Sequence, residues 1–223
     1  MSVELDFWAV LAQWPILLTG LYWTVFLTVV SAAGGLLIAI IFAWVRTAGP
    51  LWLRAFVGTY VEFIRNTPFI IQLFFIFFGL PALGVRLSPE LASVLAMAIN
   101  LSAYSTEIIR AGVQATPKGQ IEAAQSLALT TPQIYLRIVM PPALQKVWPA
   151  LVSQIIIVML GSAVCGQISA PELSYAANLI QSRNFRAFES YIVVTLIYLL
   201  LAILTRAALN WMGSRFLFGG QRG

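Results

Sequence analysis

The sequence contains no histidine, a single cysteine and few charged residues. Without histidine it has no imidazole to act as a base or a metal ligand, and Cys165 alone cannot form an intrachain disulfide or a cysteine-rich metal site. Charged residues make up 9% of the 223 positions, whereas average soluble domains contain about 25%. Because hydrophobic residues make up 60%, the composition excludes an ordinary soluble domain and indicates a membrane protein with several spans.

Five apolar runs in the sequence are candidates for membrane spans. A helix needs roughly 20 residues to cross about 30 Å of hydrocarbon. The runs cover about residues 15–45, 66–83, 90–109, 149–168 and 190–211. The first run is longer than a perpendicular crossing needs, so we expect it to tilt or project, and the second takes residues from the mixed segment before it. The sequence predicts an all-α membrane protein with one transmembrane domain over residues 1–223.

The basic residues are distributed unequally between the connections of these spans. Of the thirteen lysines and arginines, ten fall in one set of alternating regions and three in the other. Basic residues favour the cytoplasmic side of a membrane, so we expect the N-terminus outside and the C-terminus in the cytoplasm of a multi-pass plasma-membrane protein. The net charge of +5 therefore reports orientation. A nucleic-acid partner would need a basic stripe on a soluble face, and none is predicted.

Several predicted helices begin at a serine or threonine followed by proline. The hydroxyl can accept a hydrogen bond from a free amide of the first turn, and proline fits the first helical position. The four pairs are Thr67-Pro68, Ser88-Pro89, Thr116-Pro117 and Thr131-Pro132.

Two of these starts lie in the cytoplasmic connection, about residues 111–145, and predict two short helices, Pro117–Leu129 and Pro132–Val139. We expect Pro141-Pro142 to break the chain before the fourth span. A compact helix-break-helix suits docking of a soluble partner, but the same pattern also fits an amphipathic loop that rests on the bilayer.

Small residues recur every fourth position within the first span, at Gly35, Ala39 and Ala43, with Ser31 before them. Such spacing lets helix backbones approach closely. The pattern predicts tight packing, either within the chain or between two copies of it.

Charged and polar residues in or near the spans are the candidates for a functional site. Glu62 with Arg65, and Glu107 with Arg110, are each three residues apart and can pair on one helix face near a cytoplasmic helix end. Such pairs either anchor a helix end or serve function. Neutral polar residues near the midplane either line a path or form hydrogen bonds between helices. They are Gln72, Asn100, Ser102, Tyr104, Ser105, Gln154, Ser162 and Gln167.

Further absences limit the chemistry. No charge falls at the predicted midplane of a span, which argues against a proton-coupled carrier and against paired catalytic carboxylates. The sequence has no G-x-x-x-x-G-K-[ST] pattern, so it has no recognisable ATP site, and it has neither a G-x-S-x-G elbow nor an H-E-x-x-H helix. An intramembrane enzyme is therefore disfavoured and no metal site is predicted. A structural subunit without a transport path stays open as an alternative.

The cytoplasmic connection carries a motif. Residues Thr116–Ala128 read TPKGQIEAAQSLA, and the chain continues to Ile138-Val139-Met140-Pro141. This resembles the EAA loop of permease subunits of bacterial ABC importers, which is Glu-Ala-Ala, three residues, Gly, nine residues, Ile, one residue and Leu-Pro. The matching positions are Glu122, Ala123, Ala124, Ile138 and Pro141. Ala128 stands for the glycine and Met140 for the leucine, and we expect Ala128 to tighten or straighten the turn.

A wider resemblance connects nearly the whole chain to the polar amino-acid permeases. Phe63–Pro68, read FIRNTP, is similar to that family's FIRGTP, and Ala103–Gly112 is similar to its third-span signature. One stretch departs from the family: Leu160–Val164 reads LGSAV, where the family often has Lys-Asp-Ser/Thr-Ser-Leu.

The resemblance implies a type I importer fold and a set of partners. These are a second permease subunit, identical or homologous, two cytoplasmic ATPases that hold ATP and Mg, and an extracytoplasmic amino-acid-binding protein. It implies no cofactor on this chain. Glu122 would be the polar contact to the ATPase, and Ala123 and Ala124 would let the helix seat closely.

Overall fold

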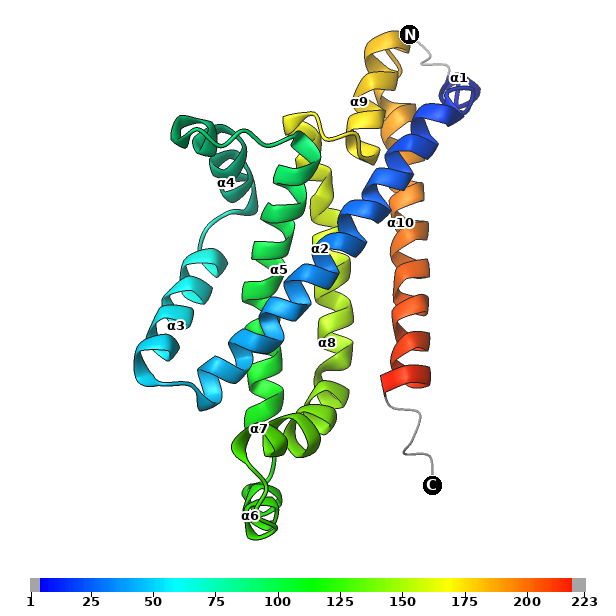
Figure 1. Cartoon of the computed structure of the whole chain (residues 1–223). Helices are drawn as coiled ribbons and strands as arrows, with labels where there is room; N and C mark the ends of the chain where they lie inside the picture. The colour runs from blue at the N-terminus through cyan, green and yellow to red at the C-terminus, as the bar shows by residue number, and fades with distance from the viewer. Residues whose placement is uncertain (1–4, 218–223) are drawn as a thin grey trace.

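The computed structural model describes residues 5–217, and this part of the chain is helical without a strand. Four helices are long and apolar enough to cross a membrane: α2 (Trp14–Ala48), α5 (Pro89–Gln114), the span Thr131–Ile168 built around α8 (Met140–Gly161), and α10 (Ala187–Met212), whose span extends to Arg215. Figure 1 shows α5, α8 and α10 running along the bundle. Glu4 and Arg222, which contribute to the charge distribution, lie outside the described residues.

Helix α2 has 35 residues, about 50 Å at 1.5 Å per residue, and it crosses the bundle diagonally in front of α5 and α8 (Figure 1). Its predicted tilt is therefore present. Its small residues pack against α5: a Cβ on Gly35 would lie 2.9 Å from the Ala98 carbonyl oxygen, and the Ser31 hydroxyl donates to the Val94 carbonyl at 3.2 Å. The close packing predicted for this stripe thus occurs within the chain.

The predicted second span, 66–83, is wrong as a single helix. The structure has α3 (Leu51–Arg65), then α4 (Phe69–Phe74), the π-helix η1 (Phe75–Gly79) and the 3-10 helix η2 (Leu80–Leu83). The two halves, Leu51–Arg65 and Phe69–Leu83, bend by 108°. Pro68 lacks an amide hydrogen and disfavours helical geometry at the preceding residue, so the helix ends there. Counted as one span, this pair brings the total to the predicted five.

Only one of the four predicted hydroxyl caps forms. The Ser88 hydroxyl accepts from the Leu91 amide at 3.3 Å at the start of α5. At α4 and α6 (Lys118–Ser126) the N-cap residue is the proline itself. At α7 (Thr131–Gln133) the cap is Thr130, whose amide donates to Gln133 Oε1 at 2.9 Å.

The connection between α5 and the fourth span is shorter than predicted, and no break separates it from that span. The π-helix η3 (Ile134–Val139) follows α7 and runs directly into α8. The predicted break at Pro141-Pro142 is therefore wrong. Both prolines stand in the first turn of α8, where the change from π to α geometry occurs. They have no amide hydrogen to donate to the preceding turn, yet the helix continues through them.

The connection between the fourth span and α10 folds into an apolar helix, as the spacing of Leu173, Ala176, Ala177 and Ile180 at helical intervals predicts. This helix packs across the bundle. After the 3-10 helix η4 (Ser162–Ile168) comes α9 (Leu173–Asn184). Its predicted face is buried against α2 and α10, in a cluster with Val10 of the short helix α1 (Trp8–Leu11). This face consists of Leu173, Ala176, Ala177 and Ile180. The described chain ends in the π-helix η5 (Gly213–Leu217).

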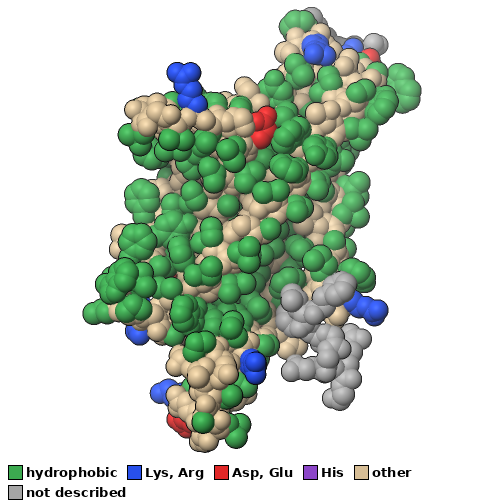
Figure 2. Space-filling model, in the orientation of Figure 1, with side chains coloured by type: hydrophobic (Ala, Val, Ile, Leu, Met, Phe, Trp, Pro, Cys, Tyr) green, Lys and Arg blue, Asp and Glu red, His purple; other side chains and the backbone are tan. Residues whose placement is uncertain are grey.

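The surface agrees with a membrane-spanning bundle. Figure 2 shows hydrophobic side chains over most of the length of the visible face, with the coloured charged side chains gathered towards its two ends.

Candidate functional site

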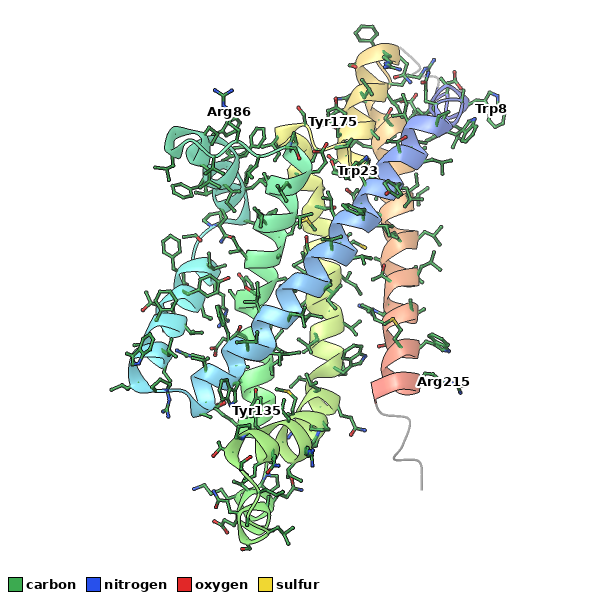
Figure 3. The ribbon with its side chains drawn as sticks, in the orientation of Figure 1. Trp8, Trp23, Arg86, Tyr135, Tyr175 and Arg215 are labelled. Carbon is green, nitrogen blue, oxygen red and sulfur yellow. The ribbon has the colours of Figure 1, made fainter. Side chains whose placement is uncertain are left out.

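Helix α6 carries the EAA residues and projects from one end of the bundle (Figure 1). Ala124 is buried against η3, where it meets Ile134 and Tyr135; Figure 3 labels Tyr135 at this end of the molecule. Gln120 lines a small cavity beside α5 and α8. Glu122 is two residues from both Ala124 and Gln120, which places it about 200° around the helix axis from each. It is exposed, like its neighbour Ala123. The helix therefore attaches by one face and presents Glu122 on the other.

The turn after α6 keeps the left-handed conformation that glycine favours, although Ala128 occupies it. Ala128 has φ of +55°, its amide donates to the Gln125 carbonyl at 2.9 Å, and the Leu129 amide donates to the Ala124 carbonyl at 3.3 Å. This is the Schellman pattern of helix ends. The expectation that alanine would tighten or straighten the turn is wrong, because these bonds offset a left-handed cost of about 1–2 kcal/mol.

The two remaining motif residues of the segment lie on either side of the junction between η3 and α8. Ile138 is partly buried against the cluster that holds Ala124, and Pro141 is exposed in the first turn of α8. The motif is thus a helix, a turn and a helix joined to a span.

The break between α3 and α4 is closed by the side chain of Gln72. Its Nε2 lies 2.7 Å from the Ile64 carbonyl, 3.1 Å from the Thr67 carbonyl and 2.9 Å from the Thr67 hydroxyl. Its Oε1 accepts from Asn100 Nδ2 of α5 at 3.2 Å. Gln72 therefore satisfies carbonyls that the break leaves free and ties the broken pair to α5, as backbone polarity within a membrane requires.

The other polar residues of α5 divide into bonded and unbonded groups. The Ser102 hydroxyl lies 2.7 Å from that of Tyr60 on α3, and the Tyr104 hydroxyl donates to the Arg65 carbonyl at 3.3 Å. Ser105 is buried, and its hydroxyl has no hydrogen-bond partner in the described part of the chain. Bonding between helices thus accounts for Asn100, Ser102 and Tyr104.

The polar residues of the fourth span make no hydrogen bond with the α5 set among the described residues. Ser162 is buried and donates to the Met159 carbonyl at 2.6 Å. Gln154 is buried in α8, whereas Gln167 is exposed on η4.

One of the two predicted ion pairs forms. Arg110 Nε donates to Glu107 Oε2 at 2.9 Å, and Arg46 at the end of α2 lies 3.5 Å from Glu107 Oε1. Arg46 was missed because its proximity to α5 depends on the tilt of α2. Within residues 5–217, Glu62 and Arg65 form no ion pair; the Arg65 guanidinium instead lies 5.4 Å from the centroid of the Tyr104 ring.

Glu172, which the sequence reasoning did not single out, is fully buried at the start of α9. Its carboxylate accepts from the amides of Ser174 and Tyr175, both at 2.7 Å, and from the Tyr198 hydroxyl of α10 at 2.6 Å. Burial raises the pKa of Glu172 to about 7, although these three donors favour the ionised form. A Cβ on Gly166 would lie 2.5 Å from Oε1. The available signal was an acidic residue directly before an apolar helix face.

These residues do not make a metal site. Among the described residues no group of three or more His, Cys, Asp and Glu side chains could hold a metal ion. The arrangement is a helical lever at one end, a polar break beside α5, and a buried carboxylate at the other end.

Comparison with known proteins identifies the family. Residues 35–217 match the model of the binding-protein-dependent transport system inner membrane component. The chain is 38% identical to the probable glutamine ABC transporter permease protein GlnM of Bacillus subtilis (strain 168), over 88% of this chain and 91% of that protein. It is 36% identical to the L-cystine transport system permease protein TcyB of the same organism, over 86% and 82%.

A solved structure agrees with this match. The crystal structure of an amino acid ABC transporter with histidines covers 96% of this chain and 100% of its own, with a TM-score of 0.86 and 33% identity. In such systems ATP is hydrolysed by a separate subunit. The chain therefore belongs to the binding-protein-dependent transport system inner membrane components, as the transmembrane permease of a bacterial ABC amino-acid uptake system.

Proposed function

We propose that this chain forms half of the pathway for a polar amino acid and receives the movement of the ATPase through α6. In this proposal the N-terminus lies outside, α6 faces the cytoplasm, and a second permease subunit completes the path. A binding protein delivers the solute at the outer end. The observation that carries the proposal is the exposed Glu122 face of α6, on a helix whose opposite face is fixed to the bundle through Ala124.

The path from α6 to the membrane is direct. Ala124 packs on Ile134 and Tyr135 of η3, and η3 continues without a break through α8 to Ile168. A displacement of α6 by the ATPase would therefore move the fourth span, because packed helices move as units rather than deforming continuously. The candidate coupling residues are Glu122, Ala123, Ala124, Ala128, Ile138 and Pro141.

The polar residues around the broken pair and α5 are the candidates for the solute path, with Gln154, Ser162 and Gln167 of the fourth span. Leu160–Val164 contains no charged residue. The solute is therefore either recognised without a charged pair in the fourth span, or contacted at that point by the partner permease. Relatives that carry glutamine and cystine support a polar amino acid.

The test is Glu122→Lys in the complex reconstituted into vesicles. We expect ATP-driven amino-acid uptake to fall at least tenfold while membrane insertion is unchanged, because the charge reversal places a cation where the ATPase would offer a basic group. Uptake and co-purification of the ATPase are measured together. Glu90→Lys, with the same charge change in the first turn of α5, is the control and should retain the ATPase. Unchanged uptake by the Glu122 variant would count against the coupling role.

A further inference from the structure

We propose that the Arg65 guanidinium binds the α-carboxylate of the transported amino acid. The proposal rests on the proposed function, because it assigns a solute contact within the same pathway. It starts from a charged side chain at the break between α3 and α4 that has no carboxylate partner within residues 5–217.

Arg65 lies near the middle of the subunit rather than at its cytoplasmic end, where the sequence placed it. Its carbonyl accepts from the Tyr104 hydroxyl, and Tyr104 lies about 4 Å of helix rise from the midpoint of α5. On the other side of this midpoint, Gln72 binds Asn100. The end of α3 therefore lies beside the middle of α5, because α3 supplies only half of a span and ends there.

A cation at this depth cannot face lipid without a large cost. Arginine keeps its charge in proteins, and placing one in hydrocarbon carries a large free-energy cost. Arg65 is exposed in the single subunit and stacks only on the Tyr104 ring. We infer that its face lines the pathway or a subunit interface, where water and an anion can reach it.

Within the described chain, no acidic group lies at ion-pair distance from Arg65, and Glu107, whose carboxylate attracts it from further away, is shared with two other arginines. Glu107 has Arg46 and Arg110 as its ion-pair partners, and Glu62, one turn before Arg65, is exposed and unpaired among the described residues. Three arginines therefore share one carboxylate, and the excess positive charge leaves Arg65 able to bind an anion from outside this chain. A planar guanidinium matches the two oxygens of a carboxylate, and every amino-acid solute carries one.

The neighbouring polar groups fit this assignment. Asn100, Tyr104 and Gln72 are neutral and lie around the same break, and the fourth span lacks the charged pair common in the family. In this arrangement Arg65 holds the part that all amino acids share, and the neutral groups contact what differs between them.

The test measures binding to the purified permease–ATPase complex without its binding protein. The probes are L-glutamine, L-arginine, L-cystine and L-histidine, each beside its α-carboxamide, which lacks the negative charge. We expect the complex to bind the transported amino acid about ten- to a hundredfold more tightly than its amide. Arg65→Gln should remove this preference, and Arg65→Lys, which keeps the charge but not the fork, should retain part of it.

Arg54→Gln on the same helix is the matched control and should keep the full preference. Each variant is first checked for co-purification with the ATPase at the normal complex size. If Arg65→Gln fails to assemble, Arg65→Lys decides, and an unchanged preference in either variant overturns the proposal. It is also overturned if Arg54→Gln removes the preference equally, since the loss would then not be specific to Arg65. A wild-type complex that imports none of the four amino acids contradicts the proposed function itself.

Discussion

The two ends of the subunit each hold a buried or half-buried carboxylate, and the two are neutralised in different ways. At the end that carries α6, Glu107 is flanked by Arg46 at 3.5 Å and by Arg110, with Nε at 2.9 Å. At the α9 end, Glu172 has three neutral donors and, within the described residues, no cation at ion-pair distance. Arginine keeps its proton at any physiological pH, so Glu107 is held by fixed charges, as is Glu189 of α10, which pairs with Arg186 at 3.0 Å. Glu172 is held by neutral donors and can titrate.

The difference gives the α9 end its own pH response. Burial raises the pKa of Glu172 from an ordinary 4.5 to about 7, so the folded state holds the proton longer than the unfolded state. The favourable contribution of this group is complete below the ordinary pKa and is lost as the pH rises through the folded value. The contact between α9 and α10 should therefore weaken between pH 5 and pH 8.

The largest expected effect comes from reversing the charge of Glu172. Glu172→Lys would place a buried cation among three hydrogen-bond donors at the start of a helix. We expect a loss of about 4 kcal/mol or more, seen as little assembled protein after detergent extraction. Glu172→Gln, which keeps the shape, is the control and should be recovered in clearly higher yield. Equal recovery of both variants would contradict the burial of the Glu172 carboxylate at the start of α9.

A smaller effect should follow from pH alone. Because a shift of one pKa unit corresponds to about 1.4 kcal/mol, deprotonation of Glu172 between pH 5 and pH 8 should lower the stability of the contact between α9 and α10 by about 3 kcal/mol. Amide hydrogen exchange at the start of α9 measures this, corrected for the intrinsic pH dependence of exchange. The profile should flatten in Glu172→Gln, and a variant that keeps the wild-type slope would assign the titration to another group.

The smallest effect is expected at the end that carries α6. Glu107→Gln removes the ion pairs with Arg46 and Arg110, whose side chains are 24% and 27% exposed, so solvent screening limits the loss to about 1–2 kcal/mol. Thermal melting of the reconstituted complex at low and high salt measures it, and the difference from wild type should shrink with salt. A double-mutant cycle with Arg46→Ala separates the contact between helices from the one within α5. A coupling energy near zero would show that Arg46 adds nothing to this end.

The sequence predicted the long spans because each is a continuous apolar run, and it predicted close packing of α2 because small residues repeat at helical spacing. It left open whether that packing lies within the chain or between two copies, and the structure identifies α5 as the neighbour. It could not reveal the break after Arg65, since hydropathy averages over a bend and the apolar run begins in the second half. The prolines at 141 and 142 were misread because a first-turn proline and a helix-ending proline look alike until the preceding turn is known.

The site residues likewise divide into those that the sequence could place and those that it could not. The exposure of Glu122 agrees with the helical period, which places it opposite Ala124. The burial of Glu172 arises where α9, α10 and η4 meet, and no local pattern contains this information. The position of Arg65 beside the middle of α5 was missed for the same reason as the break, and its distance from any carboxylate became visible only with Glu107 paired to Arg46 and Arg110.

The turn at Ala128 has a consequence for how such loops are recognised. The family pattern is written with glycine at this position, yet the chain adopts the glycine conformation with alanine. This turn thus depends on the backbone dihedral angle at position 128 rather than on the presence of glycine there. A search for coupling loops by their letters would score this position as a mismatch, whereas a search by their torsion angles would accept it.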